Sequence, residues 1–248
     1  RISTMAEVLD LMICIFPFEK DLYEESGLPT IFAGHPLVDE MAVLSRNGIE
    51  RDLNLVALLP GSREREVENL FPPMLGAAAL MLKQRPDLRF AATGATPVLT
   101  ERLRALTAQA GLSHSVEVGV QSSHDIMQRS GIGVVASGTA TLEAACLGLP
   151  YCLTYKVAWL TAQVARYLMS VDFLGIVNVM AGRELVTELL QGKATPEGIA
   201  QELSRLLDQP EVRKKLQEEL SEVVESLGGG AHENAARAIS QVWEDGDL

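Results

Sequence analysis

Short apolar runs alternate with amphipathic segments along most of the chain. A short apolar run between turn residues is typical of a buried strand, whereas apolar residues spaced three and four apart are typical of a helix that packs on a sheet. Their alternation predicts an α/β fold in which parallel strands are joined by crossover helices. The predicted strands are residues 11–16, 30–33, 53–59, 88–93, 115–118, 132–136 and 150–155. Helices are predicted at 18–26, 64–84, 97–110, 122–130, 139–148 and 157–169.

The pattern changes in the last third of the chain. Residues 185–191, 195–208, 210–227 and 231–244 are predicted to be helical with no strand between them, so a helical tail closes the chain. Residues 35–52 lack a clean period, which is typical of an interdomain linker. We therefore expect three structured parts: a remnant of one Rossmann-like domain at 1–34, a second such domain at 53–228, and a C-terminal helix at 229–248. A glycine hinge at 228–230 is expected before the last helix.

Composition narrows the classes of function. The chain has 248 residues, enough for a large buried core, and its net charge is −12 with 21 basic and 33 acidic residues. Without a basic run to offset that charge, a nucleic-acid groove is not expected. Three cysteines among apolar neighbours indicate reduced, buried thiols in a cytoplasmic protein. No charge-free apolar run is long enough to span a bilayer, and no signal peptide is visible.

The four histidines show no metal-ligand spacing, so no metal site is expected. His35, in a Gly-His-Pro sequence after a predicted strand, is interpreted first as a histidine satisfied within a turn. His124 is interpreted as a residue at a helix start. No Gly-x-Ser-x-Gly elbow supports covalent hydrolysis.

The strand 53–59 ends in a turn that could hold an anion. Pro-Gly-Ser-Arg follows it, and then a charged helix. Gly61 lets the backbone approach a ligand, Ser62 can cap the helix, and the amides at the helix start carry partial positive charge. Arg63 adds a fork of donors that matches phosphate. An ordinary capped turn with a solvated arginine fits these residues equally well, since neither the Walker nor the Gly-x-Gly-x-x-Gly pattern is present.

A turn of the same kind follows the strand 132–136. Ser137, Gly138 and Thr139 stand at the start of a predicted helix, another amide-rich terminus. Glu143, one turn further, could accept both hydroxyls of a ribose; it could also be a solvated residue or a capping partner of Thr139. Two anion-binding turns at the carboxyl edge of one sheet suit a nucleoside diphosphate that carries a sugar.

Asn178 interrupts an apolar run just before Gly182 and a predicted helix. If it is buried, its amide must find hydrogen bonds. As a structural residue it would cap a turn, and as a functional residue it would bind a sugar hydroxyl or a diphosphate oxygen. Arg183 is either a second phosphate donor or an arginine that faces water at a helix start.

Four motifs give the chain a resemblance to a known family. They are FPFEKDLYEESGLPTIFAGHPLVDEM, LLPGSREREV, ASGTATLEAACLGLPYCLTYKV and VNVMAGRELVTELLQ, in that order and over nearly the whole chain. The sequence resembles the lipid-A-disaccharide synthase family, whose members are GT-B type glycosyltransferases with two Rossmann-like domains. The resemblance implies inverting, metal-independent transfer of 2,3-diacylglucosamine from its UDP derivative to 2,3-diacylglucosamine 1-phosphate, with release of UDP. No cofactor is implied, because the UDP-sugar is a substrate.

The resemblance also implies roles for the residues singled out above. Arg63 would contact the donor diphosphate and Asn178 the donor near the reacting carbon, so these two are the expected catalytic residues. Glu143 would bind the ribose. The residues expected to bind the nucleotide are Gly61, Ser62, Ser137, Gly138, Thr139, Glu143 and Arg183. The resemblance gives weaker support for a role of His35.

Further expectations concern the surroundings of the enzyme. Family members carry more sequence at the amino terminus, which supplies the acceptor side and the general base, so we expect residues to precede Arg1. Acyl chains on both substrates imply peripheral contact with the inner membrane, with residues 155–180 as a contributor or else as a core helix. A homodimer formed through the last helix is plausible, although that helix could equally pack back on the first domain.

Two alternatives stay open. A UDP-N-acetylglucosamine epimerase or a peptidoglycan-precursor transferase would share a helix-start glycine and glutamate, although LLPGSREREV and NVMAGREL fit those enzymes poorly. A non-catalytic fragment that binds UDP would account for the absent amino-terminal motifs.

Overall fold

The computed structural model describes residues 2–45, 49–119, 122–156 and 173–244. It divides the chain into two compact units, Arg1–Ser45 with Glu222–Leu248, and Arg46–Ser221. The helix expected at 157–169, and with it most of the segment expected to meet a membrane, lies outside the described residues.

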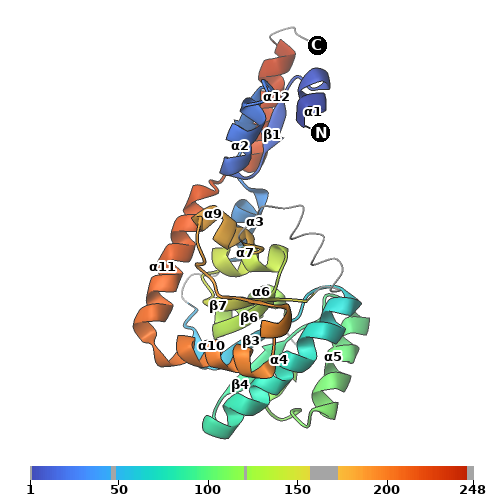
Figure 1. Cartoon of the computed structure of the whole chain (residues 1–248), viewed down its shortest axis with the longest axis vertical. Coiled ribbons are helices and arrows are strands. Elements are labelled where there is room, and N and C mark those ends of the chain that lie inside the picture. The colour runs from blue at the N-terminus through green and yellow to red at the C-terminus, as the bar shows by residue number, and fades with distance from the viewer. Residues whose placement is uncertain (1, 46–48, 120–121, 157–172, 245–248) are drawn as a thin grey trace. The chain divides into compact units, whose positions relative to one another are not determined.

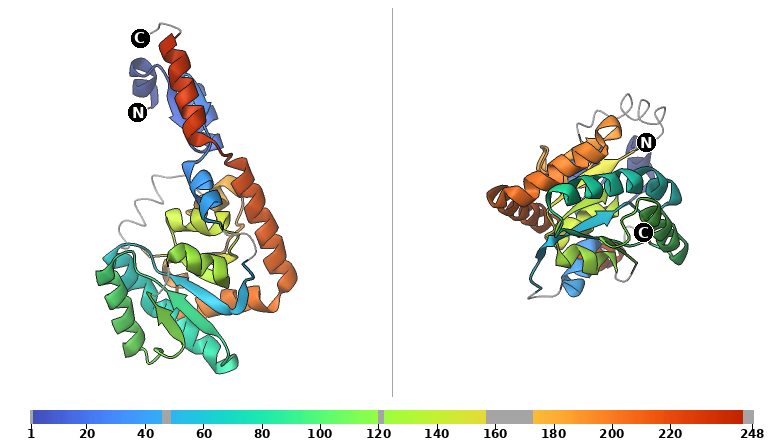
Figure 2. Two further views of the ribbon diagram at one scale, coloured as in Figure 1. Left: turned by 180° about the vertical axis from the view of Figure 1, so that it is seen from behind. Right: turned by 90° about the horizontal axis from the view of Figure 1, so that it is seen from below.

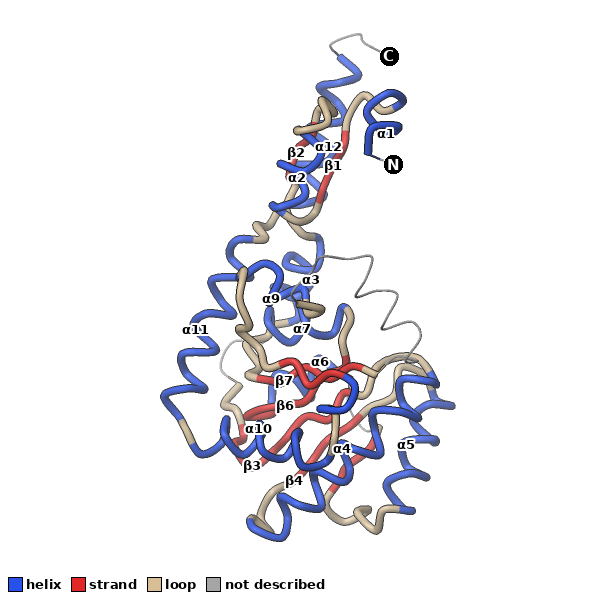
Figure 3. Tube along the Cα trace, viewed as in Figure 1, coloured by secondary structure: helices blue, strands red, loops and turns tan. Residues whose placement is uncertain are grey.

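The second unit is built on a six-stranded parallel sheet of order β5-β4-β3-β6-β7-β8 (Figures 1 and 3). This is the doubly wound order, in which the winding direction reverses between the two central strands, β3 and β6. The five strands predicted here are confirmed, with ends that differ by at most two residues. The strands are β3 (Asp52–Leu59), β4 (Arg89–Ala92), β5 (Val116–Val118), β6 (Ser130–Ala136), β7 (Tyr151–Tyr155) and β8 (Glu188–Leu190).

Helices cover both faces of this sheet (Figure 2). One face carries α4 (Glu64–Gln84), α5 (Pro97–Gln109) and α10 (Pro196–Asp208), which pack on one another. The other carries α6 (Ser123–Arg129), α7 (Thr139–Cys146) and α9 (Ile176–Ala181). Because both faces are covered, the central strands are largely apolar: every residue of β6 is buried, as are the last five of β3. This explains why the pattern of these strands was readable in the sequence.

The helix predicted at 185–191 is wrong. Residues Glu188–Leu190 form β8, which pairs in parallel with β7, and Gln191–Lys193 form a single 3-10 turn. The sequence LVTELL places apolar residues at spacings that fit either a helix or a strand, and a segment of this length cannot stabilise a helix by itself. The free edge of β7 decides in favour of the strand.

A partly buried arginine ties the ends of two helices to the start of β3. Arg51 donates from Nη1 to the main-chain oxygens of Met127 (2.6 Å) and Ser130 (2.8 Å), and from Nη2 to that of Leu147. These carbonyls lie at the ends of α6 and α7, where helix geometry leaves them without intrahelical partners. Burial lowers the pKa of Arg51 to about 10, so the side chain is still charged at neutral pH.

Replacing Arg51 should therefore destabilise the second unit. We expect Arg51→Ala to lower the free energy of unfolding by about 2 kcal/mol, because three carbonyl groups lose their donors. Chemical denaturation followed by circular dichroism measures the loss. Arg89→Ala is the matched control, since the Arg89–Asp52 ion pair is exposed and should contribute less than about 1 kcal/mol. Equal losses in the two variants would contradict the role given to Arg51.

The first unit joins both ends of the chain. Its elements are α1 (Ile2–Val8), β1 (Met12–Cys14), α2 (Pro17–Glu24), β2 (Thr30–Phe32), α3 (Pro36–Leu44) and α12 (Ala231–Glu244), while α11 (Pro210–Ser226) leads from the second unit into it. β1 and β2 pair in parallel. α12 packs on α3, so the last helix belongs with the amino-terminal residues of the same chain.

The linker is shorter than residues 35–52. His35 caps a helix that begins at Pro36, and the first unit extends to Ser45. Leu37 and Met41 are buried on this helix. Most residues of this helix are apolar, so the sequence shows no clear one-sided period, but its cap and its proline at the first helical position are sufficient to start a helix.

The glycines at 228–230 form a fixed turn. Gly230 and Ala231 donate their main-chain N–H groups to the carboxylate of Asp39, at 2.8 and 3.0 Å. These bonds lower the pKa of Asp39. A Cβ on Gly34 would lie 3.1 Å from the oxygen of Gly229, so the two backbones meet closely. The hinge predicted here is therefore a tight turn held by α3.

Candidate functional site

The turn after β3 holds a carboxylate of its own chain. Gly61 has φ +104°, and the turn folds around the side chain of Glu66. Glu66 Oε2 accepts from the main-chain N–H of Ser62 (3.0 Å) and of Arg63 (3.2 Å), while Oε1 accepts from Arg63 Nη1 (2.9 Å). Two amides and a guanidinium thus converge on one anion, which is the donor set that a phosphate also needs.

This geometry changes two expectations. Ser62 was expected to cap the helix, but Arg63 is the N-cap residue and Glu66 supplies the capping side chain. The amides were expected to face outward without partners, but Glu66 engages two of them. The reason is the spacing of the sequence, because a glutamate at the third helical position can reach back over the N-cap. A diphosphate at this turn must take these donors from Glu66.

The turn after β6 is open on its outer side. Ser137 donates its main-chain N–H to Thr154 at 3.0 Å, which continues the ladder between β6 and β7. Gly138 has φ +147°, and nothing lies within 4 Å of the place where a Cβ would stand. Thr139 begins α7 and is exposed. The first N–H groups of α7 have no partner within the helix by geometry, so this turn offers amides to a ligand.

The fold places the two turns at the same edge of the sheet. β3 and β6 are neighbours in parallel register, with Leu59 opposite Val135. Gly61 follows the end of one strand by two residues, and Gly138 follows the end of the other by two. The structure therefore brings together the Gly61–Arg63 and Ser137–Thr139 turns at the point where the winding of the sheet reverses, where ligands bind in doubly wound folds.

Glu143 faces a histidine that the sequence did not connect with it. Glu143 Oε2 lies 3.2 Å from Nε2 of His124. The side chains are 21% and 28% exposed, respectively, so both are accessible from solvent. α6 and α7 pack on each other, and this contact brings the pair together although 19 positions separate the residues. None of the interpretations of Glu143 from the sequence included this partner.

Asn178 is buried and uses its whole hydrogen-bonding capacity. Its Nδ2 donates to the main-chain oxygen of Val186 (2.8 Å) and to Glu188 Oε1 (2.9 Å). Its Oδ1 accepts from the N–H groups of Leu185 and Val186, both at 2.8 Å. The side chain thus fixes the turn between α9 and β8, in agreement with the capping interpretation. The donor contact implied by the resemblance stays a prediction, and it would require one of these bonds to be given up.

Glu188 completes this network and is a residue that the sequence analysis missed. Its buried carboxylate accepts from the N–H groups of Leu174 and Gly175 as well as from Asn178. The interactions join β8 to the start of α9. The available signal was a glutamate inside an apolar stretch. It was missed because residues 185–191 were assigned to a helix, on which a glutamate can face solvent.

Each of the two remaining candidates has partners that are not part of the two turns. Arg183 donates to Glu219 Oε1 at 2.8 Å on α11, which leaves it half exposed and paired. His35 belongs to the first unit, where its Nδ1 accepts from the N–H of Leu37 and its ring contacts Phe16. Burial lowers the pKa of His35, and this supports a neutral capping residue.

The cysteines are free and do not form a reactive centre. Burial raises the pKa of Cys146 to about 11, and it also raises those of Cys14 and Cys152. All three thiols are therefore protonated at neutral pH, as expected of structural cysteines. In the part of the chain that the structure describes, no three His, Cys, Asp or Glu side chains gather in a way that could hold a metal ion. Across the same residues, none of the helices is both long and apolar enough to cross a bilayer.

With its doubly wound sheet and paired turns, the chain has the GT-B type of fold. This fold is found in glycosyltransferases and in related enzymes that act on nucleotide sugars. The chain belongs to the lipid-A-disaccharide synthetase family, whose model matches residues 1–242. It is 37% identical over 257 residues to a lipid-A-disaccharide synthase of Persephonella marina, and 40% identical over 244 residues to one of Syntrophus aciditrophicus. These alignments cover 98% and 95% of this chain but 67% and 63% of the relatives, so the chain spans about two thirds of their length.

Solved structures with much lower identity share the fold. S. aureus MnaA with UDP has a TM-score of 0.68 at 13% identity, with 97% of this chain and 62% of that chain covered. The pneumococcal O-GlcNAc transferase GtfA, in complex with UDP and GlcNAc, has a TM-score of 0.54 at 14% identity, with 98% and 46% covered. At these identities the likeness concerns the fold alone.

Proposed function

We propose that this chain is the donor-binding part of a lipid-A-disaccharide synthase. In that reaction, 2,3-diacylglucosamine moves from UDP to the 6-hydroxyl of 2,3-diacylglucosamine 1-phosphate, and UDP leaves. One observation carries the proposal: two donor-rich turns follow the two central strands at one sheet edge, in a chain of this family. One of these turns already binds a carboxylate through three donors.

The chemistry of the two turns fits the departure of UDP. Breaking the bond between sugar and phosphate builds negative charge on the diphosphate. Arg63 and the amides of the β3 turn would receive that charge on one side, and the amides at the start of α7 on the other. The main-chain amides are held by the fold before the reaction, so they need little reorientation once Glu66 has released those of the β3 turn. Glu143 would accept from the ribose hydroxyls.

The surroundings of the enzyme are part of the proposal. Both substrates carry acyl chains, so we place the enzyme at the cytoplasmic face of the inner membrane as a peripheral protein. A net charge of −12 disfavours electrostatic attraction to anionic lipid, so apolar contact would have to hold it there. A homodimer is compatible with the proposal. A chain that binds UDP without turnover is the second candidate, and the coverage of about two thirds of each relative favours testing it.

Calorimetry with UDP and UMP tests the proposal. We expect UDP to bind at one site per chain and about tenfold more tightly than UMP, because the second phosphate adds a charge-assisted contact. A turnover assay with both acylated substrates, run on the same preparation, separates the enzyme from a binding fragment. Binding with product supports the transferase, binding without product supports the fragment, and no binding contradicts both.

A further inference from the structure

The pair formed by His124 and Glu143 has a defined direction. A carboxylate has acceptors only, so the hydrogen bond requires a proton on Nε2 of His124, whichever charge state the ring has. Glu143 Oε2 accepts the hydrogen bond, with 3.2 Å between it and Nε2. The bond occupies one lone pair of one oxygen, which leaves the acceptor sites of Oε1 for a ligand.

His124 is well placed to restrain this carboxylate. It lies in the first turn of α6, where Ser122 caps the helix by accepting from the N–H of Asp125 at 3.1 Å. The main-chain oxygen of His124 also accepts from Gln128 Nε2 at 3.4 Å. α6 packs on β3, β4, β6 and α7, so its start is fixed relative to the sheet. Glu143 itself lies on a different helix, and a free glutamate would sample several rotamers at a cost in entropy on ligand binding.

We propose that His124 is a positioning residue for ribose recognition. By donating a hydrogen bond to Glu143, it holds the carboxylate in an orientation that can accept hydrogen bonds from two adjacent hydroxyl groups. It thereby sets the preference of the site for a ribonucleotide over a 2′-deoxyribonucleotide. This inference rests on the proposed function, because it takes UDP as the ligand and Glu143 as the group that meets its ribose.

The role differs from that of a phosphate ligand. If His124 instead bound the diphosphate, its removal would weaken UDP and 2′-deoxy-UDP by the same factor, because both carry that group. A positioning role weakens the contacts of Glu143 with the ribose hydroxyls, and UDP loses a 2′ contact that 2′-deoxy-UDP never makes, so the ratio of the two affinities changes. A residue with a merely structural role would leave this ratio unchanged.

Calorimetry of the full chain with UDP and 2′-deoxy-UDP tests the inference. We expect the wild-type chain to prefer UDP by about tenfold, as befits one hydrogen bond to a charged acceptor. Glu143→Ala should abolish the preference, and His124→Ala should reduce it to about threefold or less. His124→Gln places an amide donor near the position of Nε2 and should restore most of it. His114→Ala, at an exposed histidine on the same unit, is the matched control and should leave the ratio unchanged.

The outcomes distinguish a failure of the proposed function from a failure of the role given to His124. A wild-type chain that binds neither nucleotide contradicts the proposed function, and so does a Glu143→Ala variant that keeps the full preference. If Glu143→Ala loses the preference but His124→Ala retains it, the role of His124 is overturned while the ribose contact stands. Equal weakening of both nucleotides in His124→Ala also overturns that role. A reduced ratio in His124→Ala, restored by His124→Gln, supports it.

Discussion

Asn178→Ala is expected to lower the free energy of unfolding by about 3 kcal/mol. The change removes four hydrogen bonds at a position that is 1% exposed. It leaves two N–H groups, a carbonyl and part of the Glu188 carboxylate without partners in an apolar surrounding. Leaving a buried polar group without a partner costs more free energy than the hydrogen bond contributed. The expected loss of stability therefore exceeds that of an ordinary polar substitution. Urea denaturation measures it.

Two further variants decide whether the network is the cause. Asn69→Ala is the matched control, because Asn69 makes one exposed hydrogen bond to Arg65 and should cost less than about 0.5 kcal/mol. Asn178→Asp places a second carboxylate 2.9 Å from Glu188, so it should be at least as harmful as alanine. Adding Glu188→Gln to Asn178→Asp restores a donor opposite an acceptor and should recover part of the loss. A double variant no more stable than Asn178→Asp would count against this explanation.

Arg63→Ala is expected to reduce kcat/KM by about 30- to 1,000-fold, which corresponds to about 2–4 kcal/mol of transition-state stabilisation. The guanidinium is the only side-chain donor of the β3 turn in the described hydrogen bonds to Glu66, and it would meet charge that develops on the departing UDP. Its side chain is 82% exposed, so folding should be unaffected. Steady-state kinetics with the acylated substrates measures the effect, and the melting temperature checks the fold.

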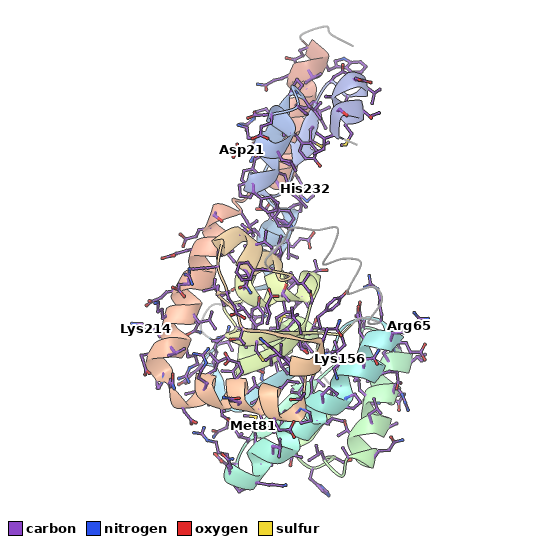
Figure 4. All side chains as sticks on the ribbon, viewed as in Figure 1. Asp21, Arg65, Met81, Lys156, Lys214 and His232 are labelled. Carbon is purple, nitrogen blue, oxygen red and sulfur yellow. The ribbon has the colours of Figure 1, made fainter. Side chains whose placement is uncertain are left out.

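Arg65→Ala is the matched control for this prediction. Arg65 lies two positions further along, carries the same charge, is exposed, and points outward from the start of α4 (Figure 4). A general loss of positive charge near the turn would affect both variants alike, whereas a specific contact would affect Arg63 alone. An unchanged rate in Arg63→Ala, or an equal loss in Arg65→Ala, would contradict the role given to Arg63.

The fold was largely readable from the chain because its central strands are buried on both faces. β3 and β6 therefore contain continuous apolar runs at residues 55–59 and 131–136, and the helices between them have one apolar side. The hydrophobic pattern did not identify elements that are short and whose packing partner is distant in the sequence. β8 has three residues and exists because β7 offers a free edge, and α3 is recognisable by its cap more than by its period.

The candidate site divides in the same way. Gly61, Arg63, Gly138 and Glu143 could be proposed from the sequence, because turns after strands and polar residues at helix starts are local features. The partners of these residues were not identified from the sequence. Glu66 reaches back into the turn of Arg63, a contact that its spacing from the N-cap allows, and Glu188 binds Asn178 from a strand that was taken for a helix. The second contact depends on the pairing of β8 with β7, which the local pattern does not specify.

The sequence by itself determined the order of strands and helices from β3 to β7, the two glycine turns and the membership of the family, because each of these depends on local pattern or on motifs. The tertiary structure decided which groups meet: Arg51 with the ends of α6 and α7, Asp39 with the glycine turn, and His124 with Glu143. The reason is physical. Hydrophobic periodicity records burial against a neighbour, but a hydrogen bond between residues distant in the chain depends on the packing of whole elements, which only the folded chain sets.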